Sequence, residues 1–286
     1  MKGGSGGAGR TVDKYADDWE ANARRDPRFA ILSDPAHNDG GWDDENDAFM
    51  ASGVREIDAV FAHLDEHSLA PVRRRRALDF GCGLGRLSNA LGSRFDAVVG
   101  VDISATMVEK ATALAVGPHV TFVVNQADDL GQFDDSSFDF VYTNIVLQHV
   151  DNDLQRGYLA EFCRVLAPGG LAVVQLPSLR RGWKGTVRRI LPDAATTLVR
   201  RFGRPEGTLR REGYTIRMEM NCLPESEVWA IVEARSAVVA HTTYTNAAEP
   251  DFNGRPVFMD SVGAWQRAAG GGYVSPVYVI RRRLDP

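Results

Sequence analysis

The sequence predicts an α/β fold in which a mostly parallel sheet is flanked by helices. Short apolar runs at 77–80, 97–101, 120–125, 138–143 and 171–176 have the length of buried strands, and stretches with helical spacing separate most of them. A turn that contains three glycines follows the first run directly. Strands that alternate with helices in this way favour a parallel sheet.

The first strand leads into a glycine turn and then into a helix. Ala77 to Phe80 is apolar, Gly81, Gly83 and Gly85 follow, and Arg86 to Phe95 has the pattern of a helix. Because glycine has no Cβ atom, the turn can adopt left-handed dihedral angles, and a ligand can lie against bare backbone beside the amides of a helix N-terminus. The stretch is therefore predicted to cradle a ligand.

Two acidic residues accompany this turn. Asp79 lies in the first strand, and Asp102 closes the next strand, 97–101, about 20 residues further on. A carboxylate at that position accepts hydrogen bonds from both hydroxyls of a ribose. NAD, FAD and S-adenosylmethionine all carry a ribose, so the spacing alone leaves these three cofactors open.

Four blocks in order carry a resemblance to a known family, from this turn to about Pro177. They read LDFGCGLGR, VGVDIS, FDDSSFDFVYTNIVLQHV and RVLAPGGLAVVQLP. On these blocks the chain resembles the class I S-adenosylmethionine-dependent methyltransferases, and among them the small-molecule O-methyltransferases. The resemblance implies a Rossmann-like, mostly parallel seven-stranded sheet flanked by helices, with an N-terminal helical cap and a basic helical insertion after the fifth strand.

The resemblance also implies the cofactor, S-adenosyl-L-methionine, and its product, S-adenosyl-L-homocysteine. It assigns cofactor contacts to Tyr15, Trp19, Arg55, Asp79, Gly81, Cys82, Gly83, Asp102, Ile103, Met107, Gln126, Ala127, Asp128, Asn144 and Ile145. In this family the residue that ends the third strand is commonly an acid that binds the adenine amino group. Gln126 stands there in this chain, so either its carbonyl oxygen or Asp128 takes that role.

The composition is that of one core with a modest extra lobe. The chain has 286 residues, of which 44% are hydrophobic. Its three cysteines, Cys82, Cys163 and Cys222, are odd in number and widely spaced, which predicts a reducing compartment with neither a disulfide framework nor a zinc site. Without an apolar run of about 18 residues or a leader-like segment, a cytoplasmic location is expected. Residues 1–10 are glycine-rich and are expected to be disordered.

Residues 11–70 are predicted to form an N-terminal helical cap. A helix from Val12 to Arg24 carries Tyr15 and Trp19 four positions apart, and Pro27 is expected to end it. Two interpretations of this aromatic pair are open. It packs on the main domain, or it forms a lid over the cofactor's methionine end, where a sulfonium cation favours an aromatic face.

A polar loop, 33–47, and a second amphipathic helix complete the cap. Four side chains there have chemistry to offer: His37, Trp42, Arg55 and Glu56. Arg55 is expected to bind the methionine carboxylate, His37 and Trp42 the acceptor, and Glu56 is a candidate for catalysis. The competing interpretation for each is a solvated or structural role, which is usual for charged residues on helices.

His149 is the main candidate for a general base. It follows Asn144 after the fourth strand, in the predicted floor of the pocket, where a neutral imidazole can accept the proton of a hydroxyl. A turn-capping role is the structural alternative. His149, Asp151 and Asp153 are also close enough in sequence to suggest a divalent metal, but a helix that starts with Asp153 as its N-cap is favoured, so no metal ligand is assigned.

The basic residues of the chain are concentrated after the fifth strand. Between Arg180 and Arg217 there are eleven Lys or Arg and three acidic residues, a net charge of +8, whereas the other residues sum to −13. Apolar residues recur at helical spacing from Val187 to Leu198. Residues 180–220 are therefore predicted to be a basic, helical substrate cap, which could equally meet an anionic membrane surface or another subunit of a homo-oligomer.

The predicted core comprises 71–179 and 221–286. A helix over 224–235 and two closing strands, 238–244 and 277–283, complete it. His241 and Tyr244 lie in the first closing strand and are expected to contribute to acceptor binding, with a core position as the alternative for His241.

The leading hypothesis is a methyltransferase that acts on a small-molecule hydroxyl, such as that of a sugar, a glycolipid or a natural product. The (N/D)PP(Y/F) run of amino-directed enzymes is absent, since Asn144 is followed by Ile145 and Val146. An RNA methyltransferase or RNA-binding protein that uses the Arg-rich insertion is the alternative, disfavoured by the net charge of −5. A nicotinamide-dependent oxidoreductase is a third hypothesis. It does not explain the PGG block.

Overall fold

A computed structural model describes residues 8–32, 46–180, 208–211, 214–217, 219–247, 255–268 and 272–284. The helices are α1 (Ala8–Arg25), α2 (Pro27–Ile31), α3 (Asn46–Glu66), α4 (Arg86–Gly92), α5 (Ala105–Ala113), the 3₁₀ turn η2 (Leu147–His149), α6 (Asn152–Val165), α9 (Glu225–Glu233) and α10 (Val262–Ala268). The strands are β1 (Arg76–Phe80), β2 (Ala97–Asp102), β3 (Val120–Val124), β4 (Phe138–Thr143), β5 (Leu166–Gln175), β6 (Leu179–Arg180), β7 (Thr208–Arg211), β8 (Tyr214–Arg217), β9 (Ala237–Thr245), β10 (Phe258–Met259), β11 (Tyr273–Val274) and β12 (Pro276–Arg282). Within the described ranges, no helix has the length and apolar character that a bilayer-spanning segment needs.

The main sheet has eight strands in the order β10-β9-β12-β5-β4-β1-β2-β3. Strands β5, β4, β1, β2 and β3 run parallel, and β12, β9 and β10 add antiparallel neighbours. The predicted α/β fold is confirmed, and the two-residue edge strand β10 comes in addition to the seven strands expected. The chain order reverses at β1, which pairs with both β2 and β4, and such a reversal opens a crevice at the carboxyl ends of the strands.

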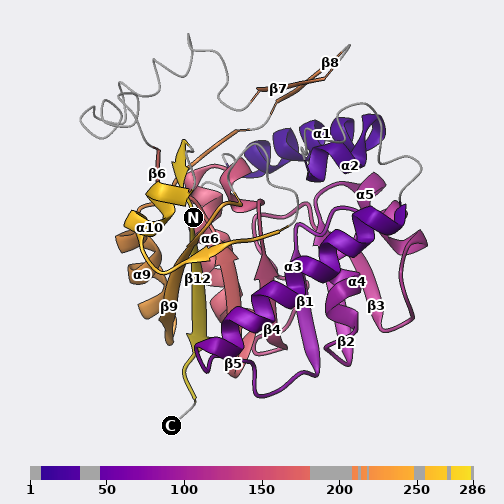
Figure 1. Cartoon of the computed structure of the whole chain (residues 1–286). Helices are drawn as coiled ribbons and strands as arrows, with labels where there is room; N and C mark the ends of the chain where they lie inside the picture. The colour runs from indigo at the N-terminus through magenta and orange to yellow at the C-terminus, as the bar shows by residue number, and fades with distance from the viewer. Residues whose placement is uncertain are drawn as a thin grey trace, which may run out of the picture.

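Helices cover both faces of the parallel strands (Figure 1). Neighbouring residues of β1 face opposite ways. Ala77 packs in a cluster with α3 and α4, and Leu78 packs in a second cluster with α6 and α9. Burial on both faces explains why these strands are continuous apolar runs. Although the sequence analysis includes α3 in the cap, Ile57 and Phe61 pack this helix directly against the sheet.

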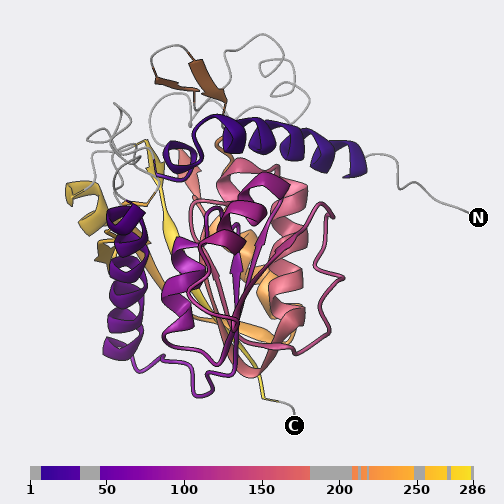
Figure 2. The ribbon, with the colours of Figure 1, turned by 90° about the vertical axis from the view of Figure 1, so that its right-hand side faces the viewer.

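The first two helices lie across the edge of the sheet at which the crevice opens (Figure 2). The predicted helix over 12–24 is confirmed within α1. Pro27 begins α2, where its missing N–H costs no helical hydrogen bond. Ala30 and Leu32 pack with Met107 of α5, which joins these helices to the core.

Two local features differ from the predictions. Asp151, not Asp153, is the N-cap of α6, because its Oδ1 accepts hydrogen bonds from the backbone N–H groups of Asp153 and Leu154, both at 3.0 Å. The described part of the basic insertion includes an antiparallel pair, β7 and β8, which the sequence analysis did not predict. Its Tyr-Thr-Ile run favours a strand. The predicted helical stretch 187–198 lies outside the described residues.

Candidate functional site

The crevice begins at the glycine turn after β1. Gly81 and Gly83 have φ angles of 79° and 52°, and a Cβ atom on Gly81 would lie 2.3 Å from the Cγ2 atom of Val146. The backbone N–H groups of Gly81 and Cys82 donate to the carbonyl oxygen of Val101 at 2.8 and 2.9 Å, which fastens the turn to β2. The predicted turn is therefore confirmed, and its geometry requires glycine.

Asp102 is held at the end of β2 by two backbone donors. The N–H of Gly83 donates to Oδ2 at 2.8 Å, and the N–H of Ser104 donates to Oδ1 at 2.9 Å. Burial raises the pKa of Asp102, although these hydrogen bonds oppose the shift. Each carboxylate oxygen has a lone pair left, so the fixed side chain can still accept from the hydroxyls of a ribose.

A pocket of about 950 Å³, open mouth included, lies at this edge of the sheet. Ten of the predicted cofactor residues line it: Tyr15, Trp19, Gly81, Cys82, Gly83, Asp102, Ile103, Met107, Asn144 and Ile145. The sequence analysis missed the other lining residues: Ala30, Ile31, Phe80, Arg86, Leu87, Val101, Asn125, Val146, Val150 and Tyr158.

The three residues predicted to end the third strand beside the adenine lie outside the pocket lining. Gln126, Ala127 and Asp128 are exposed and do not belong to the lining, whereas Asn125 does. The reason is that β3 ends at Val124, one residue earlier than predicted, so the chain has already turned outward at position 126.

Other predicted residues lie away from the pocket wall. Arg55 is exposed on α3 and does not belong to the pocket lining, which does not support its assignment to the methionine carboxylate. Asp79 is buried behind the glycine turn, where it accepts a hydrogen bond from the hydroxyl of Ser88 at 2.6 Å. His37 and Trp42 lie outside the described residues.

A buried ion pair stands beside the glycine turn. Nη2 of Arg86 lies 2.8 Å from Oε2 of Glu56, and the two side chains are 3% and 0% exposed. Oε1 of Glu56 accepts hydrogen bonds from the hydroxyl of Tyr142 at 2.9 Å and from the amide of Asn144 at 2.7 Å. Glu56 is thus an internal anchor outside the pocket lining, which corrects its assignment to catalysis.

Arg86 belongs to the pocket lining and has unused donors. Its Nε and Nη1 atoms are buried and have no hydrogen-bond partner among the described residues. A buried donor without a partner costs about 1–3 kcal/mol. An anionic group bound in the pocket would supply the acceptors that these nitrogens lack. The signal that could have identified Arg86 was its position directly after the third glycine of the turn.

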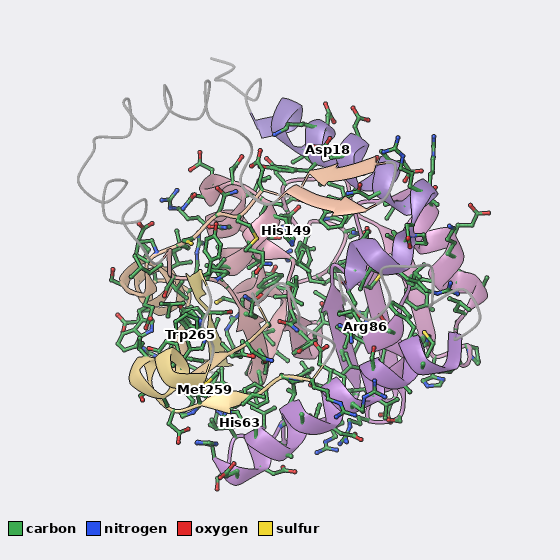
Figure 3. All side chains as sticks on the ribbon, turned by 45° about the horizontal axis from the view of Figure 1, so that its top comes forward. Asp18, His63, Arg86, His149, Met259 and Trp265 are labelled. Atoms are coloured by element: carbon green, nitrogen blue, oxygen red, sulfur yellow. The ribbon has the colours of Figure 1, made fainter. Side chains whose placement is uncertain are left out.

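His149 lies next to the pocket rather than on its wall. Its Nδ1 donates to the backbone carbonyl of Glu219 at 2.8 Å, so the lone pair is on Nε2, 3.4 Å from the side-chain amide of Gln148. Burial lowers the pKa of His149 to about 4, and the ring is therefore neutral near pH 7. Its ring meets the edge of Trp19, with 5.5 Å between centroids, and Trp19 does line the pocket (Figure 3 labels His149).

Glu219 joins α1 to the segment before α9, and the sequence analysis did not single it out. Its carboxylate accepts from the hydroxyl of Tyr15 at 2.8 Å and from Nζ of Lys14 at 2.6 Å. Burial opposes ionisation, but these two hydrogen bonds lower the pKa of Glu219. The aromatic wall formed by Tyr15 is therefore tied to the backbone that orients His149.

The two predicted acceptor residues on β9 lie elsewhere. The His241 ring packs against His67 with 4.2 Å between centroids, in a cluster of histidines, and its assignment to acceptor binding is corrected. The hydroxyl of Tyr244 lies 3.4 Å from both carboxylate oxygens of Glu225, also outside the pocket lining.

A family model described as a methyltransferase domain matches residues 78–174. The chain is 37% identical over 133 residues to a demethylmenaquinone methyltransferase of Clavibacter sepedonicus, covering 44% of this chain and 53% of that protein. It is 34% identical over 137 residues to a malonyl-[acyl-carrier protein] O-methyltransferase of Enterobacter lignolyticus, covering 46% and 50%. The chain thus spans about half the length of these curated relatives.

Solved structures share the fold. A putative sarcosine dimethylglycine methyltransferase from Galdieria sulphuraria has a TM-score of 0.53 at 13% identity, covering 79% of this chain and 85% of that one. A geranyl diphosphate methyltransferase in complex with SAM has a TM-score of 0.51 at 20% identity, covering 78% and 84%.

The buried carboxyl of Asp79 makes stability depend on pH. Burial, with repulsion from Glu56 and Asp102, raises the pKa of Asp79 to about 7. A raised folded-state pKa stabilises the fold below the unfolded value near 4, and this contribution is lost as the pH rises toward 7. We therefore expect Asp79→Asn to gain a few kcal/mol relative to wild type between about pH 4 and pH 7 in urea unfolding. A difference that does not change with pH would contradict this assignment.

Proposed function

We propose that the chain is a class I S-adenosylmethionine-dependent methyltransferase, in keeping with the methyltransferase domain model that matches residues 78–174, and that it transfers a methyl group to an oxygen of a small-molecule acceptor. The cofactor of this family is S-adenosylmethionine, which supplies a methyl group already activated by its sulfonium charge. The chain's own task is to hold the donor and the acceptor in line, and to accept a proton when the acceptor is a hydroxyl.

The observation that carries the proposal is that two nitrogens of the Arg86 guanidinium, Nε and Nη1, have no hydrogen-bond partner among the described residues. Arg86 belongs to the lining of the same pocket as the glycine turn and Asp102. These three features match three parts of the cofactor. The carboxylate of Asp102 would accept from the ribose hydroxyls, the bare backbone at Gly81 would lie against the nucleoside, and Arg86 would bind the methionine carboxylate.

The aromatic side of the pocket suits the remaining part of the cofactor. Tyr15 and Trp19 of α1 line the wall, and an aromatic face attracts a sulfonium cation. We infer that the methyl group points toward this wall. The aromatic pair would then both cover the methionine end of the cofactor and pack on the main domain, because Tyr15 is also part of the main apolar cluster.

The acceptor is proposed to be a hydroxyl of a sugar, a glycolipid or a natural product. Supporting this, two of the relatives are named as a malonyl-[acyl-carrier protein] O-methyltransferase and a ubiquinone biosynthesis O-methyltransferase. Val146 and Val150 give the pocket apolar wall as well, which suits an acceptor with an apolar part.

Titration calorimetry tests the cofactor, and transfer of labelled methyl groups tests the acceptor. We expect S-adenosylhomocysteine to bind with one site per chain and NADH not to bind. A panel of hydroxylated small molecules should yield labelled product, whereas RNA should not. A chain that binds no S-adenosylhomocysteine would overturn the proposal, and labelled RNA would replace the acceptor class without changing the cofactor.

The variant Arg86→Lys tests whether Arg86 binds the methionine carboxylate of the cofactor. Lysine keeps the charge beside Glu56 but cannot reproduce the planar guanidinium. We expect affinity for S-adenosylhomocysteine to fall by roughly tenfold or more, since a charged hydrogen bond contributes about 1.5–3 kcal/mol. Affinity for methylthioadenosine, which lacks the carboxylate, should change little. The exposed Arg55→Lys is the matched control, and equal losses for both ligands would contradict the assignment.

His149→Gln tests the proposed general base. We expect turnover to fall by roughly 10²–10⁴-fold, the usual contribution of a base, with S-adenosylhomocysteine affinity retained. Because the unprotonated ring is the active form, wild-type turnover should be lost as the pH falls through about 4, and this inflection should be missing in the variant. Full turnover in the variant would remove His149 from the mechanism.

A further inference from the structure

Three histidines meet at a place that the transfer reaction does not use. His63 lies in the last turn of α3, His67 directly follows that helix, and His241 comes from β9. Each offers one ring nitrogen, and the three nitrogens lie within 4.8 Å of one another. None of the three residues lines the cofactor pocket. In Figure 3, His63 is labelled beside Met259 near the bottom of the view, whereas His149 is labelled near its centre.

The ring nitrogens are available to a ligand. His63 is only 8% exposed, and its Nε2 is buried with no hydrogen-bond partner among the described residues. Within the same residues, Nε2 of His241 is also buried without a partner. Nδ1 of His67 lies 3.0 Å from the carbonyl oxygen of His63, to which it can only donate, so the lone pair of His67 is on Nε2. A backbone carbonyl bound to the other ring nitrogen is typical of metal-ligating histidines.

If the three histidines only pack in the core, the free-energy cost of their buried, unpaired ring nitrogens is not fully offset. Each buried nitrogen without a hydrogen bond costs about 1–3 kcal/mol, and here two lie in one cluster. Ring stacking offsets part of this, since Phe258 lies parallel to His63 with 4.3 Å between centroids. Stacking, however, does not satisfy the lone pairs, whereas a metal ion would.

The charge around the three rings also suits a metal. Neutral imidazole is the form that binds a metal ion. The carboxylate of Asp260 is close enough to act electrostatically on the rings of His63 and His241, and it adds a negative charge that favours a cation.

We propose that His63, His67 and His241 bind one divalent transition-metal ion, with Zn²⁺ as the best-fitting candidate. Imidazole ligands suit zinc, copper, iron and nickel, and three histidines leave a fourth tetrahedral position for water or a carboxylate. The three ring nitrogens lie within 4.8 Å of one another, so an ion placed at their centre would be at most about 2.8 Å from each nitrogen. Small rotations of the rings would therefore reach the roughly 2.0–2.1 Å of a zinc–nitrogen bond.

From its position, the ion would act as a structural link between two parts of the chain. The ion would join the end of α3, in the first quarter of the chain, to β9 in the C-terminal part of the sheet. Because it lies outside the cofactor pocket, it would stabilise the fold without entering the transfer reaction. The proposal is therefore independent of the acceptor and of the cofactor.

Metal content and stability test the site in the full chain. After treatment with a chelator and its removal, one Zn²⁺ per chain should bind in competition with a chromophoric chelator. Co²⁺ in its place should show the visible bands of a tetrahedral site. The ion should raise the melting temperature of the wild-type chain, because it binds the folded state alone.

Matched variants locate the ion. His67→Gln and His241→Gln should each weaken Zn²⁺ binding by at least roughly 10–100-fold and abolish the rise in melting temperature. His119→Gln, a surface histidine outside the cluster, should behave as wild type. Circular dichroism, independent of any cofactor, reports whether each variant is folded. The proposal is overturned if no ion binds, if both folded cluster variants hold it as tightly as wild type, or if His119→Gln loses it equally.

Discussion

The buried ion pair between Glu56 and Arg86 is the contact on which the candidate site depends. Glu56 is on α3, Arg86 begins α4, and the donors Tyr142 and Asn144 come from β4 and the residue after it. Removal of either charge would leave the other unpaired in a dry interior, at a cost of about 3–5 kcal/mol. The pair therefore fixes three elements at the pocket and holds the guanidinium of Arg86 against its wall.

The strand order determines where the crevice lies and which residues surround it. Because the chain crosses from β3 back to β4 on the other side of β1, the carboxyl ends of β1, β2 and β4 lie around one crevice. The glycine turn, Asp102 and Asn144 each follow one of these strand ends. Residues that are far apart in the sequence thus surround a single ligand position.

Helix α3 has polar anchors near its middle and at its C-terminal end. Glu56, near its middle, reaches toward the pocket, and His63 and His67 reach toward β9. Between them, Val60, Phe61 and Leu64 pack on the sheet. A helix that precedes the first strand is therefore part of the core, and it connects the cofactor pocket with the proposed metal site.

The sequence by itself determined the parallel strands, the glycine turn and Asp102, because these follow from apolar periodicity, backbone freedom and a spacing of about 20 residues. It also identified Tyr15 and Trp19 correctly as pocket residues. Only the tertiary structure decided which charged and titratable side chains meet one another. The ion pair of Glu56 with Arg86 and the contact of His241 with His63 depend on partners tens of residues away or more, whose approach no local pattern encodes.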